Sequence, residues 1–580
     1  MAALSQNPPP ARKDTVVVTG TWEPLPLEEA DRAVSVMPVR GADLLFNSFI
    51  DVLKLDPSLD VRQRGPNGTQ ADLSVRGGTF SQTLVLLNGR RMNDPQSGHH
   101  DLDLPVPLEG LEMVETLRGS GSTLYGSDAL GGVAHFRAKP PETAEIKLRA
   151  ALGNFGVNQE RASVALIRGS LLEHVTASRD FSTGFAPDRD FRNLSAWSAT
   201  QWKSKLGATS VDLGYADKPF GADQFYGNYN SWERTKTWYA GARQTIGEAT
   251  EGALSYRRHT DLFILYRDRP AVFRNDHIGE SWQASLRRRD RAGSSTTFFY
   301  GVEGYGDNVD STNLGRHNRQ RVAGYAAADF RALGRFSLNA GIRTESYRGI
   351  FDQVSPTLSG GYWISPAWKL RASVSRAFRL PTYTDLYYHD PGNVGNPDLR
   401  AETAWSYEGG VEWHPDSLWR VDATVFQRQD HDVIDYVRSS PSDVWHATNF
   451  QHLTFTGVEG GINWRWRASI LDVRYTGLKG VSEAIQGFQS KYVFNYPVHA
   501  AVVSWQGTYR GISARTRLGV VARKDRSAYG VWDIYGARAA GRLRPFLQLT
   551  NLTSTAYEEI VGVAMPGFGV VGGVEWTVFR

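Results

Sequence analysis

The residues best suited to do chemistry in this sequence stand close together at His99, His100, Asp101 and Asp103. Imidazole nitrogens and carboxylate oxygens are ligands that zinc accepts. Adjacent side chains of an extended segment point to opposite faces, so His99 and His100 are poorly placed to share one ion. We therefore predict no metal site and no resident cofactor, and interpret residues 93–105 as a polar connecting loop.

The signatures of common catalytic sites are missing from the sequence. It contains no cysteine, which excludes disulfides and thiolate metal sites. The glycine-rich stretch GSGSTLYGSDALGG lacks the Lys-Ser/Thr pair of a phosphate-binding loop. Neither G-x-S-x-G nor H-E-x-x-H occurs. The sequence therefore does not indicate an enzyme.

The composition favours a transmembrane β-barrel. Among 580 residues the net charge is only +4, which gives no support to nucleic-acid binding. No apolar run approaches the ~20 residues of a membrane helix, while aromatic residues make up 12% and glycine occupies 58 positions. Barrel strands alternate lipid-facing and water-facing side chains and average out polar. The competing interpretation is a secreted, soluble β-rich enzyme.

The predicted secondary structure differs between the N-terminal part and the rest of the chain. After the first third, alternating strands follow one another: in LWRVDATVFQ, Trp419, Val421, Ala423 and Val425 share one face. Very short turns alternate with long polar connections, as in outer-membrane barrels. At ~20 residues per strand and connection, the remaining roughly 435 residues give about 22 strands.

The N-terminal part has a mixed pattern. A helix is predicted over residues 42–55, where Leu44, Leu45, Val52 and Leu53 stand at helical spacing. Extended runs follow in DLSVRG, TLVLLNG, MVETLRG and VAHFRAK. We interpret this part as a small α+β domain. The opening MAALSQNPPPARK lacks the apolar region of a secretory signal, so we expect that a signal was removed and a start Met supplied.

Several long segments resemble TonB-dependent outer-membrane receptors. They are LSVRGGTFSQTLVLLNGRRMNDP and VETLRGSGSTLYGSDALGGV, followed by SRAFRLPTYTDLYY, GNPDLRAETAWSYEGGVEW and FLQLTNLTSTAYEE. Together they extend over nearly the whole chain. The resemblance implies a transmembrane antiparallel β-barrel of about 22 strands with a small α+β plug in its lumen. We assign residues 1–21 to a periplasmic leader, 22–141 to the plug and 142–580 to the barrel.

The resemblance also implies a function. A receptor of this kind carries out TonB-dependent active transport of a scarce large solute across the outer membrane of a Gram-negative-type bacterium. The length and the ending VAMPGFGVVGGVEW are most similar to the cobalamin-receptor branch, so the solute is expected to be a cobalamin-like corrinoid or a metal chelate such as a siderophore. The implied partners are TonB with its inner-membrane proton-driven motor, outer-membrane lipid and a periplasmic binding protein downstream. A passive channel or adhesin on the same barrel is the alternative.

The segment DTVVVTG has the composition of a strand, and its proline-rich flanks supply no hairpin mate. The resemblance implies that it is the TonB box: Asp14, Thr15, Val16, Val17, Val18, Thr19 and Gly20. We expect it to stay unpaired until the partner protein adds a strand to it. An ordinary first strand of the plug sheet is the alternative.

Charged residues predict a contact between plug and barrel wall. Arg76 and Arg118 each end a strand beside glycine, and a charge inside a barrel must be paired. Alternation places Glu408 and Glu459 on the inward faces of their strands. The resemblance implies the same contact. The alternative is four separately solvated residues in the lumen.

Candidate solute contacts come from three segments. The resemblance implies that the loops at 62–70 and 93–105 rise toward the outside, and residues 217–237 are predicted to form an aromatic external loop. The candidates are Asn67, Gln70, Asp94, Gln96, His99, His100, Phe220, Phe225, Tyr226 and Tyr229. Calcium binding by Asp188, Asp190 and Asp223 in outer loops is left unassigned, because they form no dense run of oxygen ligands. The last residue, Arg580, departs from the terminal Phe usual in such barrels.

Overall fold

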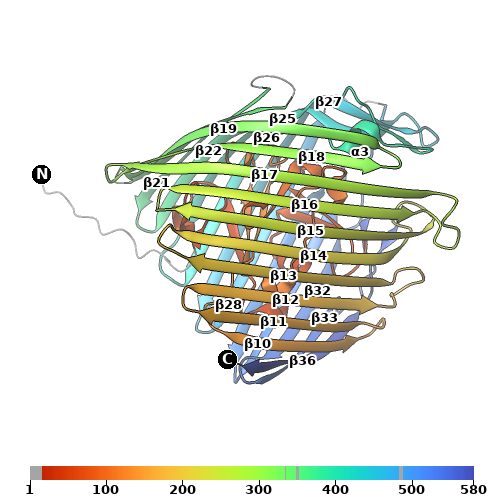
Figure 1. Ribbon diagram of the computed structural model, residues 1–580, viewed down its shortest axis with the longest axis horizontal. Coiled ribbons are helices and arrows are strands. Elements are labelled where there is room, and N and C mark those ends of the chain that lie inside the picture. Colours follow the sequence, from red (N-terminus) through yellow and green to blue (C-terminus); the bar gives the residue numbers. More distant parts are fainter. Residues whose placement is uncertain (1–15, 334, 348–351, 483–486, 580) are drawn as a thin grey trace, which may run out of the picture.

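Figure 1 shows long strands that wrap around a smaller N-terminal part. The structure is a computed structural model that describes residues 16–333, 335–347, 352–482 and 487–579. Within these ranges 22 long strands form one closed barrel, in which each pairs with its neighbours and β36 returns to β10. The predicted barrel and its strand number are therefore confirmed.

The barrel strands follow in chain order. They are β10 (Glu145–Gly153), β11 (Asn158–Arg168), β12 (Leu171–Ser182), β13 (Phe191–Lys203), β14 (Ala208–Asp223), β15 (Asn230–Ile246), β16 (Thr250–Ile264), β17 (Arg274–Ala292), β18 (Thr296–Ser311), β19 (Gly315–Leu333), β20 (Phe336–Ser346), β21 (Gln353–Ser365), β22 (Trp368–Arg379), β25 (Glu402–Trp413), β26 (Trp419–Arg438), β27 (Trp445–Trp466), β28 (Ser469–Ser482), β30 (Pro497–Tyr509), β31 (Ile512–Arg523), β32 (Tyr529–Arg538), β33 (Leu543–Thr550) and β36 (Gly569–Phe579). Short elements lie in the long connections: α3 (Tyr383–Tyr387), β23 (His389–Asp390), β24 (Asn393–Val394), β29 (Gln489–Ser490), β34 (Glu558–Ile560) and β35 (Val563–Ala564).

The barrel buries polar side chains and exposes apolar ones. On β26, Val425 is 61% exposed whereas its neighbour Thr424 is 2% exposed. This inversion of a soluble core arises because the apolar face meets lipid and the polar face meets the plug. No helix in the described part of the chain is long and apolar enough to span a membrane.

Aromatic pairs mark the end of the barrel that carries the short turns. Trp419 and Trp464 stack with ring centroids 5.3 Å apart, and Phe336 stacks on Tyr362 at 4.6 Å. Each pair joins neighbouring strands beside a short turn. Such a belt is typical of a membrane–water interface.

The N-terminal part fills the lumen with a five-stranded sheet. Its order is β3 (Val34–Pro38), β8 (Met113–Arg118), β9 (Gly132–Arg137), β6 (Thr83–Leu87) and β7 (Arg90–Arg91). A separate hairpin pairs β4 (Leu59–Gln63) with β5 (Ala71–Val75). Short turns of helix connect them: η1 (Leu27–Glu29), η2 (Asp43–Leu45), α1 (Phe49–Leu53), η3 (Phe80–Gln82), η4 (Gly98–His100), η5 (Leu108–Gly110) and α2 (Ser122–Tyr125).

Two expectations about individual elements were wrong. The helix over residues 42–55 is split into η2 and α1, because Ser48 and Asp51 form a capping box that starts a new helix. The segment 217–237 is mostly strand rather than loop. Strands β14 and β15 pair as far as Asp223 and Asn230, so only residues 224–229 form the connection.

Candidate functional site

A large cavity opens at the end of the barrel that carries the long connections. Its volume is about 910 Å³, which lies within the range of small-molecule sites. The plug contributes Gln96 and His99 to its wall, and the barrel contributes Tyr226, Tyr436 and Lys491. Aromatic rings beside hydrogen-bonding groups suit a bulky, partly apolar solute.

Most of the residues singled out for solute binding line this cavity. They are Gln96, His99, His100, Phe225, Tyr226 and Tyr229. Gln70 lies directly behind the wall, where its amide donates to the Tyr226 hydroxyl at 2.9 Å. Tyr226 in turn donates to Glu233 at 2.7 Å. Gln70 therefore orients a wall residue.

Three other candidates lie outside the cavity lining. Phe220 is 1% exposed and packs against Phe191, its partner across the β13–β14 pair. The main-chain carbonyl of Asn67 accepts from the Asn193 amide at 3.1 Å. Asp94 pairs with a barrel arginine, as described below. Phe220 was misplaced because the strand continues past the expected start of the loop.

His99 presents a neutral aromatic ring to the cavity. It stacks on Phe80 with centroids 4.2 Å apart, and its Nδ1 lies 2.7 Å from Asp72 Oδ1. Burial lowers the pKa of His99 to about 4 in spite of this carboxylate. Arg64 Nη1 lies 3.1 Å from the same oxygen of Asp72. A solute therefore meets an uncharged imidazole here at neutral pH.

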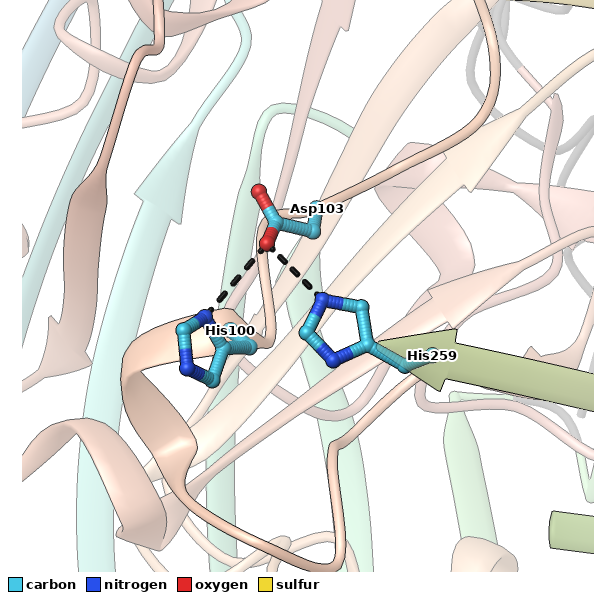
Figure 2. A group of neighbouring side chains, drawn as sticks. All are labelled: His100, Asp103 and His259. Carbon is cyan, nitrogen blue, oxygen red and sulfur yellow. Dashed lines mark hydrogen bonds and ion pairs between the residues drawn. The ribbon is translucent and has the colours of Figure 1, made fainter. Parts of the chain in front are cut away.

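His100, which lines the cavity, converges with Asp103 and His259, which do not line it (Figure 2). Asp103 Oδ2 lies 3.4 Å from His100 Nδ1 and 3.1 Å from His259 Nε2. His259 projects from β16, whereas His100 ends the turn η4. The segment is therefore a turn rather than extended, and His99 and His100 point to different carboxylates. His259 could not be singled out from the sequence, because no local pattern connects it to His100.

Asp94 belongs to the same buried region. Arg257 Nη1 lies 2.7 Å from its Oδ2, and His259 Nδ1 lies 3.0 Å from the same atom. Burial opposes ionisation of Asp94, but His259 and Arg257 lower its pKa below the usual value. Asp94 is thus an ionised internal group that positions barrel side chains.

The four charged residues predicted to join plug and wall lie together. Arg76 donates to both oxygens of Glu459 at 2.8 Å each and to Glu408 at 2.9 Å. Arg118 reaches Glu459 at 3.2 Å. Burial disfavours the charge of Arg76, yet Glu459 and Glu408 raise its pKa. The two hydrogen bonds from Arg76 to Glu459 form a bidentate pair, which is the strong geometry for an Arg–carboxylate contact.

Two further arginines complete this plug–wall cluster. Arg371 on β22 lies 3.2 Å from Glu408 Oε1, and Arg32 of the plug lies 4.0 Å from the same oxygen. Arg76 also lies over the ring of Phe426 at 4.1 Å. The alternation of β22 signals that Arg371 points inward, but no local pattern signals its partner.

The N-terminal segment is paired, contrary to expectation. Val16–Val17 (β1) pairs antiparallel with Leu25–Pro26 (β2), and the side chain of Val17 is fully buried. The proline-rich stretch thus supplies a mate, although a very short one, because Pro26 lacks an N–H and η1 follows at once. Asp14 and Thr15 lie outside the described residues.

Plug side chains hold the rest of this segment. The N–H groups of Val18 and Thr19 donate to Glu115 Oε2 at 3.0 and 2.8 Å. The Gly20 N–H donates to the Tyr125 hydroxyl at 3.2 Å. Arg137 Nη1 lies 2.8 Å from the other oxygen of Glu115. The segment is thus docked on the plug through hydrogen bonds from its own main chain.

The three aspartates considered for calcium binding, Asp188, Asp190 and Asp223, each contact an arginine side chain. The guanidinium of Arg267 lies 3.2 Å from Asp188 Oδ1 and also contacts Asp190. A fixed positive charge therefore already faces both carboxylates. Asp223 ends β14, and its main-chain carbonyl accepts from Arg189. Calcium stays unassigned.

Comparison with known proteins gives a consistent result. The family model described as "TonB dependent receptor-like, beta-barrel" matches residues 154–552, and "TonB-dependent Receptor Plug Domain" matches residues 26–133. The vitamin B12 transporter BtuB of Vibrio vulnificus is 26% identical over 495 residues, covering 77% of this chain and 75% of the relative. The iron-regulated outer membrane virulence protein of Vibrio cholerae is 24% identical over 552 residues, covering 86% and 83%. The hemophore receptor HasR of Serratia marcescens superposes with a TM-score of 0.78 at 17% identity, covering 94% of this chain and 99% of HasR.

Proposed function

This chain belongs to the TonB-dependent receptor family, and from that membership we propose that its solute is a corrinoid or a metal chelate that binds in the outer cavity. The family consists of outer-membrane β-barrels with a plug that transport large solutes actively. Relatives include a vitamin B12 transporter and an iron-regulated protein. The proposal therefore concerns which solute is taken up and how its binding reaches the periplasmic side.

The observation that carries the proposal is that plug and barrel share the cavity wall. Plug residues Gln96 and His99 line it together with barrel residues Tyr226 and Tyr436. A solute that contacts both sides alters the free energy of the plug as well as of the barrel. Coupling of solute binding to the plug requires that the solute interact differently with two states of the plug, and its contacts with plug residues provide that difference.

A chain of contacts leads from the cavity to the N-terminal segment. Asn93, the first residue of the loop 93–105, accepts from the Val85 N–H at 2.8 Å and donates to the Thr83 carbonyl at 2.9 Å, both on β6. Strand β6 pairs with β9, which carries His135. The His135 ring contacts Thr19 at 2.8 Å. We propose that solute binding weakens this docking and frees the segment.

The freed segment is proposed to bind TonB as an added strand. Docking leaves Val16 42% exposed, so a partner strand can begin pairing there. In this proposal residues 1–21 act as the periplasmic leader, 22–141 as the plug and 142–580 as the barrel. A periplasmic binding protein then receives the solute.

Direct binding and uptake test the proposal. Purified protein is titrated with cyanocobalamin and with a panel of ferric siderophores, and uptake is measured in cells with and without TonB. Saturable binding of one solute class, lowered by Tyr226→Ala and His99→Ala, supports the proposed site. Binding of no member of either class would overturn the choice of solute.

Deleting residues 14–20 separates active from passive transport. Active transport predicts preserved solute binding and lost uptake. A passive channel or adhesin predicts that uptake or adhesion is unchanged by the deletion. The plug argues against an open pore, since its charged residues are tied to the wall through Arg76 and Glu459.

A further inference from the structure

The group formed by His100, Asp103 and His259 has the donor set of a transition-metal site. Two imidazole nitrogens face one carboxylate oxygen, at 3.4 and 3.1 Å (Figure 2). A tetrahedral zinc site, with ligands about 2.0–2.2 Å from the ion, places ligand atoms roughly 3.3–3.5 Å apart. The three ligand atoms lie within 4.8 Å of one another. The observed spacing is therefore close to what an ion requires.

Each histidine is backed by a second carboxylate. His259 Nδ1 lies 3.0 Å from Asp94 Oδ2, and His100 Nε2 lies 3.4 Å from Asp261 Oδ2. A carboxylate on the remote ring nitrogen orients a metal-bound imidazole and raises its basicity. This arrangement occurs on both rings.

The outer carboxylates are themselves held in place. Arg257 lies 2.7 Å from Asp94, and the Gln96 amide donates to Asp261 at 2.9 Å. Lys218 lies 3.0 Å from Oδ1 of Asp103, which leaves Oδ2 to face the two rings. The ligand atoms are thus pre-positioned by groups that do not compete for the ion.

The charge and hydrogen bonding of this region favour an added cation. Four carboxylates gather here, those of Asp94, Asp103, Asp261 and Glu233, against the fixed charges of Arg257 and Lys218. Within the described part of the chain, Nδ1 of His100, a residue only 4% exposed, makes no close hydrogen bond, and its contact with Asp103 Oδ2 is long, at 3.4 Å. That nitrogen points at Asp103 in Figure 2.

We propose that His100, Asp103 and His259 bind a divalent first-row transition-metal ion of the zinc class. Imidazole with carboxylate suits such ions, whereas calcium and magnesium prefer oxygen ligands alone. Three protein ligands leave one position for water or for a donor atom of a solute. The inference goes beyond the proposed solute, because ion binding does not depend on what is transported.

The cavity gives the ion a way in. His100 lines the cavity together with Asp261 and Glu233, and these three residues form a second group whose ligand atoms lie within 4.8 Å of one another. His259 and Asp103 lie directly behind. Carboxylates on the cavity wall raise the local concentration of cations. His100 therefore stands between an entry group and the buried site.

Zinc binding to purified protein tests the proposal. The full chain in detergent is stripped with a chelator and titrated with zinc chloride in a calorimeter, with calcium chloride as the comparison. We expect one zinc ion per chain and no response to calcium. X-ray absorption at the zinc edge is expected to show two imidazole ligands.

Variants identify the ligands. His259→Gln and Asp103→Asn each remove a ligand and are expected to weaken zinc binding by about 100-fold or more, since loss of an outer partner alone costs about 10–100-fold. Asp94→Asn removes only an outer partner and is therefore expected to weaken zinc binding by about 10–100-fold. His174→Gln, a buried barrel histidine bonded to Ser163, is the matched control and should bind zinc like the parent.

Folding of each variant is checked by its heat-modifiable mobility on a gel. A loss of zinc affinity is interpreted only for variants that fold. Absence of stoichiometric zinc binding by the parent chain would overturn the proposal, as would parent-like affinity in folded His259→Gln and Asp103→Asn. If both variants fail to fold, the parent chain alone provides the test. An X-ray absorption spectrum at the zinc edge that shows no imidazole ligands then overturns the proposal. The measurements involve no transport, so their failure leaves the proposed uptake function unaffected.

Discussion

The Nδ1 nitrogen of His135 lies 2.8 Å from the hydroxyl of Thr19, and the opposite nitrogen, Nε2, accepts from the Gly89 N–H at 2.8 Å. Since Nε2 accepts, the neutral ring carries its proton on Nδ1 and donates to Thr19. One histidine in the plug sheet thus holds both a plug turn and the N-terminal segment. Its protonation state decides whether both bonds persist.

Acid is expected to weaken the plug through His135. Burial lowers its pKa to about 4, below the ordinary value of about 6.5, so the unfolded chain binds the proton more readily between these values. The contribution of His135 is therefore fully present above about pH 6.5 and falls by about 2 kcal/mol by pH 5. Urea unfolding between pH 7.5 and 5 measures it.

His135→Gln is the control for this pH dependence. Other groups titrate in the same window, among them His99 with a pKa of about 4. The slope of unfolding free energy against pH should therefore become shallower in His135→Gln without reaching zero. An identical slope in parent and variant would show that His135 is not the group responsible.

Removing the Glu115 carboxylate is expected to release the N-terminal segment. Glu115→Ala leaves the N–H groups of Val18 and Thr19 without their acceptor, which costs about 1–3 kcal/mol and shifts docking by about tenfold or more. The chain has no cysteine, so a spin label on Val16→Cys reports the segment alone. The label should become mobile in the Glu115→Ala background.

The same background should bind TonB more tightly. Affinity of a purified periplasmic TonB domain is measured by calorimetry in the absence of solute. Glu160→Ala removes an exposed carboxylate that pairs with Arg179 at the surface, and serves as the control. An immobile label together with unchanged affinity in Glu115→Ala would contradict the docking role.

Val17→Pro is expected to free the segment and yet stop uptake. Val17 is fully buried against the plug and pairs with Leu25. Proline removes the N–H that either strand partner would use. We expect a mobile label at position 16, normal solute binding and no transport, whereas Glu115→Ala keeps transport. Uptake at the parental rate in Val17→Pro would rule out strand addition at this segment.

Breaking the plug–wall cluster is expected to loosen the plug. Arg76→Ala leaves Glu459 and Glu408 buried with too little positive charge, and loss of one partner of a buried pair costs about 3–5 kcal/mol. Limited proteolysis of the plug in an otherwise intact barrel measures the effect. Arg179→Ala, which breaks an exposed pair 2.9 Å long, should change nothing. Equal plug cleavage in both variants would contradict the prediction.

Local patterns were enough to predict the architecture. Alternation along a strand assigns each side chain to one of two faces, so the inward direction of Glu408 and Glu459 could be read from neighbouring residues. The plug strands β5, β6, β8 and β9 were visible as short apolar runs. The number of strands followed from chain length and the spacing of turns. These properties depend on residues close in sequence.

What required the tertiary structure were contacts between distant segments. His100 lies on a plug turn and His259 on a barrel strand, so only the seating of the plug in the lumen brings them to one carboxylate. The pairing of Val17 with Leu25 was missed because the segment needs the plug surface beneath it, including Glu115, to make so short a strand stable. Alternation determines which way a side chain points, but the packing of plug against wall decides which partner it meets.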